Sequence, residues 1–218
     1  MQAEYQPGAA DTAFAKRFAS TKGEQVKTVG EAFAEFTETL GQPINALYKN
    51  MMTDIVGITH LTVVSARFVR DPIWSLGIVT ALDLLLKNYP EPGAQAKIVG
   101  ALFSSCGMDE VEVRAEAATL KKWGVGKSRA DIAAALRGEG DGPIVAVAKA
   151  AKADEYWMYS RFFAIGLVSL MEESGVEMNA DDVYPVMEEF MTTSLGKTHY
   201  TACVSLLCRK YSYPLMYV

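Results

Sequence analysis

Histidine and cysteine, which build many metal and redox centres, are scarce in this sequence. Its 218 residues include two histidines, His60 and His199, and three cysteines, Cys106, Cys203 and Cys208. The odd number of cysteines and their spacing fit neither a disulfide framework nor a zinc site, as is usual where thiols stay reduced. Neither histidine follows a glutamate at the Glu-x-x-His spacing of di-metal carboxylate bundles. We therefore predict no metal site.

Long apolar runs and an excess of positive charge are also missing. No stretch reaches the roughly 18 uninterrupted apolar residues of a membrane-spanning helix, and the nearest approach, residues 55–66, is interrupted by His60. The formal net charge is −5, with both signs intermixed, whereas a nucleic-acid binder needs a basic stripe that faces phosphates. We expect neither a spanning helix nor a nucleic-acid partner.

Motifs for catalysis and nucleotide binding are absent as well. The glycine-rich segments 124–126 and 138–142 lack the phosphate-loop pattern, because no strand leads into them. Ser160 has no histidine or lysine placed by motif as an activating base. We predict no catalytic residue, and an enzyme built on scattered carboxylates is the function class that the sequence favours least. The hydrophobic fraction of 50% predicts a folded globular body.

What is present is a succession of helix caps followed by apolar residues at helical spacing. Alternating strand patterns and hairpin signals are nearly absent, so the sequence predicts an all-α fold, a single compact bundle of about eight to nine helices without a sheet. Helices are expected at residues 28–40, 43–68, 71–89, 109–123, 128–138, 143–153, 156–173 and 198–211. Two more are expected, one running through residues 98–106 and one beginning at residue 179. Pro185 falls within the first turns of the helix that begins near residue 179, or bends it.

Two residues in the predicted helices indicate special packing. Gly77 costs a helix about 1 kcal/mol relative to alanine, which suggests that a neighbouring helix crosses closely there. Arg161 enters the most apolar helix and must extend to solvent or meet a carboxylate. We consider Asp71, Asp83 and Glu31 as its partners, and we favour a buried structural pair over a contact with another protein.

Three segments together resemble the Thylakoid Formation family of photosystem II biogenesis and repair factors, found in cyanobacteria and plastids. They are Gln42-Pro43-Ile44-Asn45-Ala46-Leu47-Tyr48, then Arg70-Asp71-Pro72-Ile73-Trp74-Ser75-Leu76-Gly77-Ile78-Val79-Thr80 with Asp83, then Tyr159-Ser160-Arg161-Phe162-Phe163-Ala164-Ile165-Gly166-Leu167. The resemblance covers about Thr28 to Glu173. The residues that we expect to maintain the fold are Asp71, Pro72, Gly77, Asp83, Tyr159, Arg161 and Gly166.

The resemblance carries expectations about function. It implies an all-helical protein without known catalytic residues or a cofactor, attached peripherally to the stromal side of the thylakoid membrane in a chloroplast or plastid. It further implies photosystem II or antenna subunits, an FtsH-type protease, or both, as partners. The function so implied is that of a non-enzymatic accessory protein of photosystem II biogenesis, repair or supercomplex organisation.

The polar composition of the first 27 residues and the extent of the resemblance together divide the chain into three expected parts. Residues 1–27 form an N-terminal arm with a short helix, residues 28–178 form the family-like helical core, and residues 179–218 form divergent C-terminal helices with an aromatic tail. Exposed aromatic and apolar side chains are typical anchors for a partner protein. The candidates for partner contact are Phe14 and Phe18 in the arm, and Tyr211, Tyr213, Leu215, Met216 and Tyr217 in the tail. A tail packed on its own bundle is the alternative.

His60 supports one function of a different class. An imidazole can ligate the magnesium of a chlorophyll, so a pigment-binding or antenna-organising helical protein that uses His60 as its ligand remains the alternative function. A histidine within an apolar helix is more often a core residue with a satisfied hydrogen bond.

Overall fold

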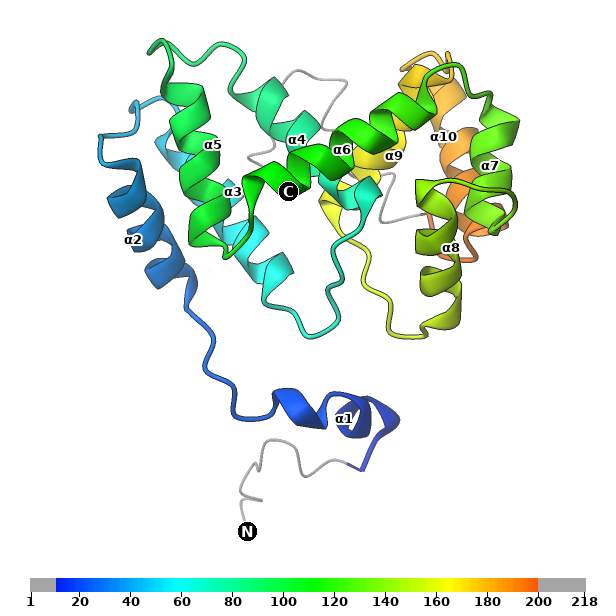
Figure 1. Cartoon of the computed structure of the whole chain (residues 1–218), viewed down its shortest axis with the longest axis horizontal. Helices are drawn as coiled ribbons and strands as arrows, with labels where there is room; N and C mark the ends of the chain where they lie inside the picture. Colours follow the sequence, from blue (N-terminus) through cyan, green and yellow to red (C-terminus); the bar gives the residue numbers. More distant parts are fainter. Residues whose placement is uncertain (1–10, 200–218) are drawn as a thin grey trace.

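The computed structural model describes residues 11–199, and this range contains ten α-helices and no strand (Figure 1). The all-α prediction is confirmed. The helices are α1 (Ala13–Arg17), α2 (Val29–Leu40), α3 (Lys49–Val63), α4 (Pro72–Leu85), α5 (Ala94–Ser105), α6 (Glu110–Gly124), α7 (Arg129–Arg137), α8 (Pro143–Ala153), α9 (Arg161–Glu173) and α10 (Ala180–Glu188). A short 3-10 turn, η1 (Ala19–Thr21), follows α1, and a π-helical segment, η2 (Glu189–Ser194), continues α10.

The helix starts follow the predicted caps. Two capping boxes form, in which a hydroxyl accepts from a backbone N–H three residues ahead while the acidic residue there accepts from the cap residue's own N–H. One pairs Thr28 with Glu31 at the start of α2, and the other pairs Ser128 with Asp131 at the start of α7. Local side-chain chemistry therefore sets where these helices begin.

The predicted helix 43–68 is wrong at both ends, because α3 spans only Lys49–Val63. Asn45 forms a turn before it: its side-chain oxygen accepts from the N–H of Leu47 at 3.1 Å, and its own N–H donates to the hydroxyl of Tyr89 at 2.9 Å. A residue whose side chain bonds its nearby backbone competes with helix. Leu47 lies in this turn and is 87% exposed.

The predicted helix 156–173 begins later than expected, at Arg161. The carboxylate of Asp154 accepts from the N–H of Tyr156 at 2.8 Å and turns the chain after α8. The hydroxyl of Ser160 then accepts from the N–H of Phe163 at 3.2 Å and caps α9. Pro185 lies inside α10, in agreement with the prediction that it falls within the first turns of this helix or bends it. The predicted helix 198–211 falls mainly outside the described residues.

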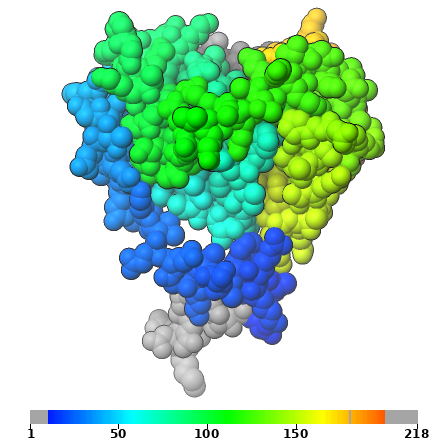
Figure 2. Space-filling view, in the orientation of Figure 1, coloured from blue at the N-terminus to red at the C-terminus, as the bar shows by residue number. Residues whose placement is uncertain are grey.

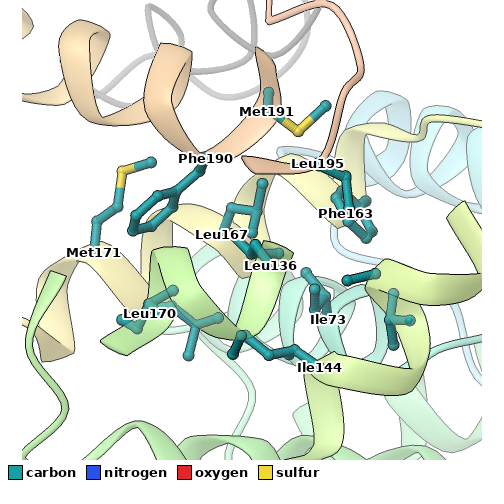
Figure 3. Packing of buried hydrophobic residues seen from close by; sticks show 14 of the residues in the cluster. Ile73, Leu136, Ile144, Phe163, Leu167, Leu170, Met171, Phe190, Met191 and Leu195 are labelled. Atoms are coloured by element: carbon teal, nitrogen blue, oxygen red, sulfur yellow. The ribbon is translucent and has the colours of Figure 1, made fainter. Parts of the chain in front are cut away.

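The core consists of two hydrophobic clusters that meet along α4 and α9. One cluster lies among α2, α3, α4 and α5 and includes Phe36, Met52 and Trp74. The other, shown in Figure 3, lies among α4, α6, α7, α8, α9 and the segment α10–η2, and includes Phe163 and Phe190. In Figure 1, α2, α3 and α5 stand on one side of the body, α7, α8 and α10 on the other, and α4, α6 and α9 connect them.

Backbone contact joins α4 to α9. A Cβ added at Gly77 would lie 1.7 Å from the carbonyl oxygen of Phe162, and one added at Gly166 would lie 2.0 Å from the carbonyl oxygen of Ile73. No side chain fits at either position, since real Cβ contacts are not shorter than about 3 Å. The close crossing predicted from Gly77 is therefore present, and its partner is the helix that carries Gly166.

The N-terminal arm lies outside the two core clusters. Figures 1 and 2 show α1 and η1 beneath the body, connected to α2 by an extended segment. No residue of α1 or η1 is buried. The arm therefore contributes nothing to the two core clusters.

Candidate functional site

The residues expected to maintain the fold fall into two groups. Asp71 caps α4, Pro72 and Gly77 lie in its first half, and Arg161 and Gly166 lie in the first half of α9. The α4–α9 crossing therefore brings the two matching segments of the sequence together. Tyr159 precedes α9 and packs against Phe163, with 6.3 Å between ring centroids. Asp83 lies apart from both groups.

Asp71 caps α4 from a partly buried position. One carboxylate oxygen accepts from the N–H groups of Ile73 and Trp74 at 2.8 and 2.9 Å, and Pro72 takes the first helical position, where an N–H would have no partner. Removal from water raises the pKa of Asp71 to about 7, although the two N–H donors lower it, and the nearby Glu116 carboxylate raises it further. This capping carboxyl is thus poised to change charge near neutral pH.

A polar cluster beside this cap attaches α4 to α6. Arg70 donates to Glu112 at 2.9 Å and to Glu116 at 3.0 Å, and the buried hydroxyl of Ser75 donates to the second oxygen of Glu116 at 2.6 Å. The hydrogen bond that Arg70 donates to Glu112 is the main cause that raises the pKa of Arg70, and Glu116 adds to it. Sequence reasoning did not identify Arg70, Glu112 or Glu116 as a cluster, because residues 41 to 46 positions apart carry no periodic signal.

The predicted buried pair of Arg161 with Asp71, Asp83 or Glu31 does not form. The side chain of Asp83 is 65% exposed and lies 3.9 Å from Arg114 of α6, while Arg161 is an exposed residue in the first turn of α9. Asp71 is engaged in its cap and Glu31 in its capping box. The apolar helix therefore begins with its arginine on the solvent side.

His60 is a core residue with a satisfied ring nitrogen. It is 3% exposed, and its Nε2 lies 2.7 Å from the carbonyl oxygen of Lys27. Because a carbonyl only accepts, Nε2 carries the proton and is unavailable as a ligand. The arrangement gives no support to the pigment-binding alternative.

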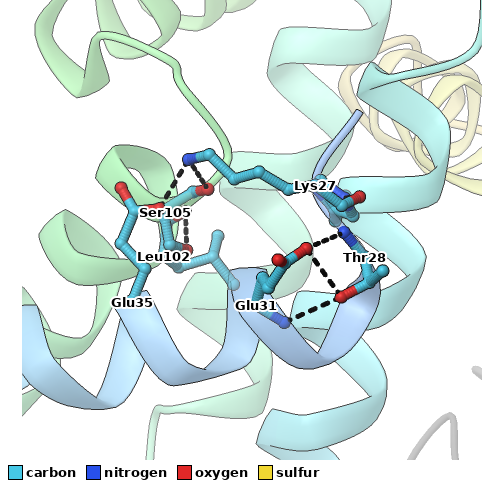
Figure 4. Close-up of polar contacts among 7 residues, drawn as sticks. Lys27, Thr28, Glu31, Glu35, Leu102 and Ser105 are labelled. Carbon is cyan, nitrogen blue, oxygen red and sulfur yellow. Dashed lines mark hydrogen bonds and ion pairs between the residues drawn. The ribbon is translucent and has the colours of Figure 1, made fainter. Parts of the chain in front are cut away.

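Lys27 fastens the end of the arm to the body (Figure 4). Its ammonium group pairs with Glu35 of α2 and lies 3.5 Å from the carbonyl oxygen of Ser105 at the end of α5, and its own carbonyl accepts from His60. Lys27 thus joins α2, α3 and α5 one residue before the capping box begins.

The arm residues Phe14 and Phe18 lie on the loop between α8 and α9. Both rings contact Tyr156, with centroid distances of 5.3 and 6.0 Å, and Phe14 remains 44% exposed. Arg17 forms an ion pair with Asp154 at 2.8 Å. The other partner-contact candidates, Tyr211, Tyr213, Leu215, Met216 and Tyr217, lie outside the described residues.

Further apolar side chains are exposed on the body, and sequence periodicity did not distinguish them from core residues. Beside the Arg70 cluster, Val69 is 75% and Val111 is 76% exposed, and Val125 at the end of α6 is 65% exposed. Within residues 11–199, no helix is long and apolar enough to cross a membrane, and no group of three metal-ligating side chains is found.

The architecture is that of an all-α protein whose two core clusters are joined by a glycine crossing. A solved structure of Psb29 has a similar fold, with a TM-score of 0.72 and 21% identity, covering 84% of this chain and 95% of that chain. A sequence profile described as thylakoid formation protein matches residues 28–204. The chain belongs to the thylakoid formation protein family.

Two curated relatives show the extent of the similarity. Thf1 of a Cyanothece strain is 29% identical over 163 residues, which cover 72% of this chain and 67% of that protein. The chloroplastic protein THYLAKOID FORMATION 1 of Arabidopsis thaliana is 29% identical over 149 residues, which cover 67% of this chain and 50% of that protein. The match therefore spans about half the length of this plant relative.

The family match starts at Thr28, as the sequence resemblance predicted, but continues to residue 204 rather than ending near Glu173. It includes α10, η2 and the residues after them, a region that the sequence predicts to be divergent. The match therefore extends into the predicted C-terminal unit.

Proposed function

We propose that this chain is a non-catalytic accessory protein of photosystem II biogenesis, repair or supercomplex organisation, acting by protein binding at the thylakoid surface of a plastid. The observation that carries this proposal is the family match over residues 28–204, which includes α2 to α10 and η2. Relatives in Arabidopsis thaliana and Oryza sativa are named chloroplastic thylakoid formation proteins. Peripheral attachment on the stromal side is part of the proposal.

The partners that we propose are photosystem II or antenna subunits, an FtsH-type protease, or both. The surface supports protein binding because it combines exposed apolar side chains with nearby charges: Val69 and Val111 flank the ion pairs of Arg70. Protein interfaces combine apolar side chains with polar and charged neighbours. The arm residues Phe14 and Phe18 and the tail residues 211–217 are the further contact candidates.

Affinity purification from detergent-solubilised thylakoids tests this function. The baits are the full chain, a chain that ends after Lys210, and the full chain with Val69→Asp and Val111→Asp, which places charge on the exposed apolar surface. Mass spectrometry identifies the recovered subunits. Recovery of photosystem II, antenna or FtsH subunits with the full chain supports the proposal.

The variants locate the contact. If only the shortened chain fails to recover these subunits, the contact lies in the tail. If only the aspartate variant fails to recover them, the contact lies on the body. Retention of native helix content, checked by circular dichroism, is the control for both. Recovery of none of these subunits with the full chain would contradict the proposed partners.

A further inference from the structure

The loop between α8 and α9 forms a fixed turn, which we call the 154–157 corner. The Oδ1 atom of Asp154 accepts from the N–H of Tyr156 at 2.8 Å. Lys197 donates to the carbonyl oxygen of Asp154 at 2.9 Å and stands over the ring of Trp157, with its ammonium nitrogen 5.7 Å from the centroid. Trp157 meets the buried ring of Phe163 edge-on, at 5.0 Å. The inner side of the corner is therefore anchored to the core before anything binds its outer side.

The outer side of the corner presents one carboxylate oxygen and one aromatic ring, and the N-terminal arm occupies both. Oδ2 of Asp154 accepts from Arg17 at 2.8 Å, while Oδ1 is held by the backbone. The Tyr156 ring contacts Phe14 and Phe18, whose own centroids lie 4.7 Å apart, and Arg17 stands 5.7 Å from the centre of the same ring. The arm thus matches the corner in charge and in aromatic geometry.

The arm's attachment elsewhere is sparse. No residue of α1 or η1 is buried, and the Arg17 side chain remains 48% exposed within its ion pair. Between Ala19 and Val26, the hydrogen bonds found in the described chain stay within the arm, such as those that Lys22 and Glu24 donate to Ala19 and Thr21. Within residues 11–199, the next contact between the arm and the body is made by Lys27. A segment held by a few exposed contacts at one end opens at little cost in stability.

We propose that the 154–157 corner is a peptide-docking site, and that the arm is its resident ligand. The ligand it takes is a short helical segment with two aromatic residues one turn apart and an arginine beside the second, the pattern of Phe14, Arg17 and Phe18. A protein segment of this chemistry binds the corner when the arm leaves it. The arm thereby controls access to a protein-binding site.

A peptide of residues 11–22 of this chain, acetylated and amidated, is the probe. It is titrated at up to several millimolar into two full-length proteins: the unaltered chain, and an open-arm variant carrying Phe14→Ala, Arg17→Gln and Phe18→Ala. Backbone amide NMR signals of residues 154–157 report binding. Since none of the three altered residues is buried, the open-arm variant retains the fold, which its remaining NMR spectrum verifies.

The open-arm variant is expected to bind the peptide with a dissociation constant at least about fivefold lower than that of the unaltered chain, because a tethered arm competes at an effective concentration in the millimolar range. The control substitution Lys16→Gln is made in the otherwise unaltered chain and changes an arm cation that pairs with Asp11 rather than with the body. It leaves the affinity for the peptide unchanged. Asp154→Asn in the open-arm variant keeps the acceptor for Tyr156 and weakens peptide binding. A peptide with both phenylalanines replaced by alanine does not bind.

Three results would overturn the proposal. They are no binding of the peptide to the open-arm variant, equal binding to the open-arm variant and the unaltered chain, and equal binding of the alanine peptide. These outcomes do not depend on which thylakoid proteins the chain contacts, so they are distinguishable from failure of the affinity purification.

Discussion

A Cβ placed on Gly77 would lie 2.8 Å from the backbone nitrogen of Gly166, so the two glycines mark the point where α4 and α9 touch through their backbones. We predict that Gly77→Ala or Gly166→Ala lowers the free energy of unfolding by about 3 kcal/mol, because the helices must separate and both core clusters contain residues of α4 and α9. Urea denaturation measures the loss.

Gly30 in α2 provides the matched control. A Cβ there would meet no atom closer than the Thr28 hydroxyl at 3.9 Å. Gly30→Ala should leave stability unchanged or raise it by up to about 1 kcal/mol, since alanine favours helix. Losses of less than 1 kcal/mol in both crossing variants would show that the crossing relaxes readily.

Asp71 gives the stability a pH dependence of defined sign. Its folded pKa is raised from 3.8 to about 7, so the folded state binds a proton that the unfolded chain releases near its ordinary pKa. The stability that the protonated carboxyl contributes is complete below pH about 4 and is lost as the pH rises through 7. Asp71→Asn keeps an acceptor for Ile73 and Trp74 without the charge.

We therefore predict that the stability of the unaltered chain falls relative to Asp71→Asn by about 2 kcal/mol between pH 4 and pH 8. This is roughly half of what 1.4 kcal/mol per pKa unit would give, because the side chain keeps some contact with solvent. Asp109→Asn, at the exposed cap of α6, controls for loss of a capping carboxylate. Parallel stability curves for the unaltered chain and Asp71→Asn would contradict the shift.

Sequence reasoning identified the fold class, most helix starts and the glycine crossing, because each depends on local chemistry or on one residue that is costly unless packing requires it. Thr28, Ser128 and Asp71 cap helices through atoms two or three residues away. The prediction failed where a side chain accepts a hydrogen bond from the backbone N–H two residues ahead and forms a turn, although the apolar spacing indicates a helix. Asn45 and Asp154 both do this. Both helices assigned there begin several residues later.

The long-range contacts could not be predicted from one sequence. Arg17 and Asp154 are 137 positions apart, and Ser75 and Glu116 are 41 apart. Charged and hydroxyl residues at such separations have many candidate partners, and only the packed helices select among them. For the same reason, the sequence left Asp71, Asp83 and Glu31 as candidate partners of Arg161, and Asp83 lies in solvent beside Arg114.

The Arg70 cluster should contribute more stability than an ordinary surface ion pair. The side chains of Arg70 and Glu116 are 29% and 31% exposed, and Glu116 also accepts from buried Ser75. We predict that Arg70→Met lowers the free energy of unfolding by about 1–2 kcal/mol, whereas Lys16→Met, in a pair that is 72% and 83% exposed, changes it by less than about 0.5 kcal/mol.

A double-mutant cycle separates the two partners of Arg70. The coupling energy with Glu116→Gln should be about 1 kcal/mol, and that with Glu112→Gln smaller, since the Glu112 side chain is 61% exposed. Urea denaturation at pH 8 measures both couplings. A larger coupling to Glu112 than to Glu116 would contradict the role of burial.

The capping box of α2 should be detectable in the ionisation of Glu31. Its carboxylate accepts from the Thr28 N–H at 2.7 Å and from the Thr28 hydroxyl at 2.9 Å, and these bonds lower the pKa of Glu31 below its usual value. Thr28→Ala removes the hydroxyl donor and frees one backbone N–H of α2, so the pKa of Glu31 should rise toward 4.5. Side-chain carbon NMR during an acid titration measures it, and the lowered pKa of Asp131, which depends on Ser128, serves as an internal reference that stays in place. A pKa for Glu31 that does not respond to Thr28→Ala would show that the hydroxyl does not hold the carboxylate in solution.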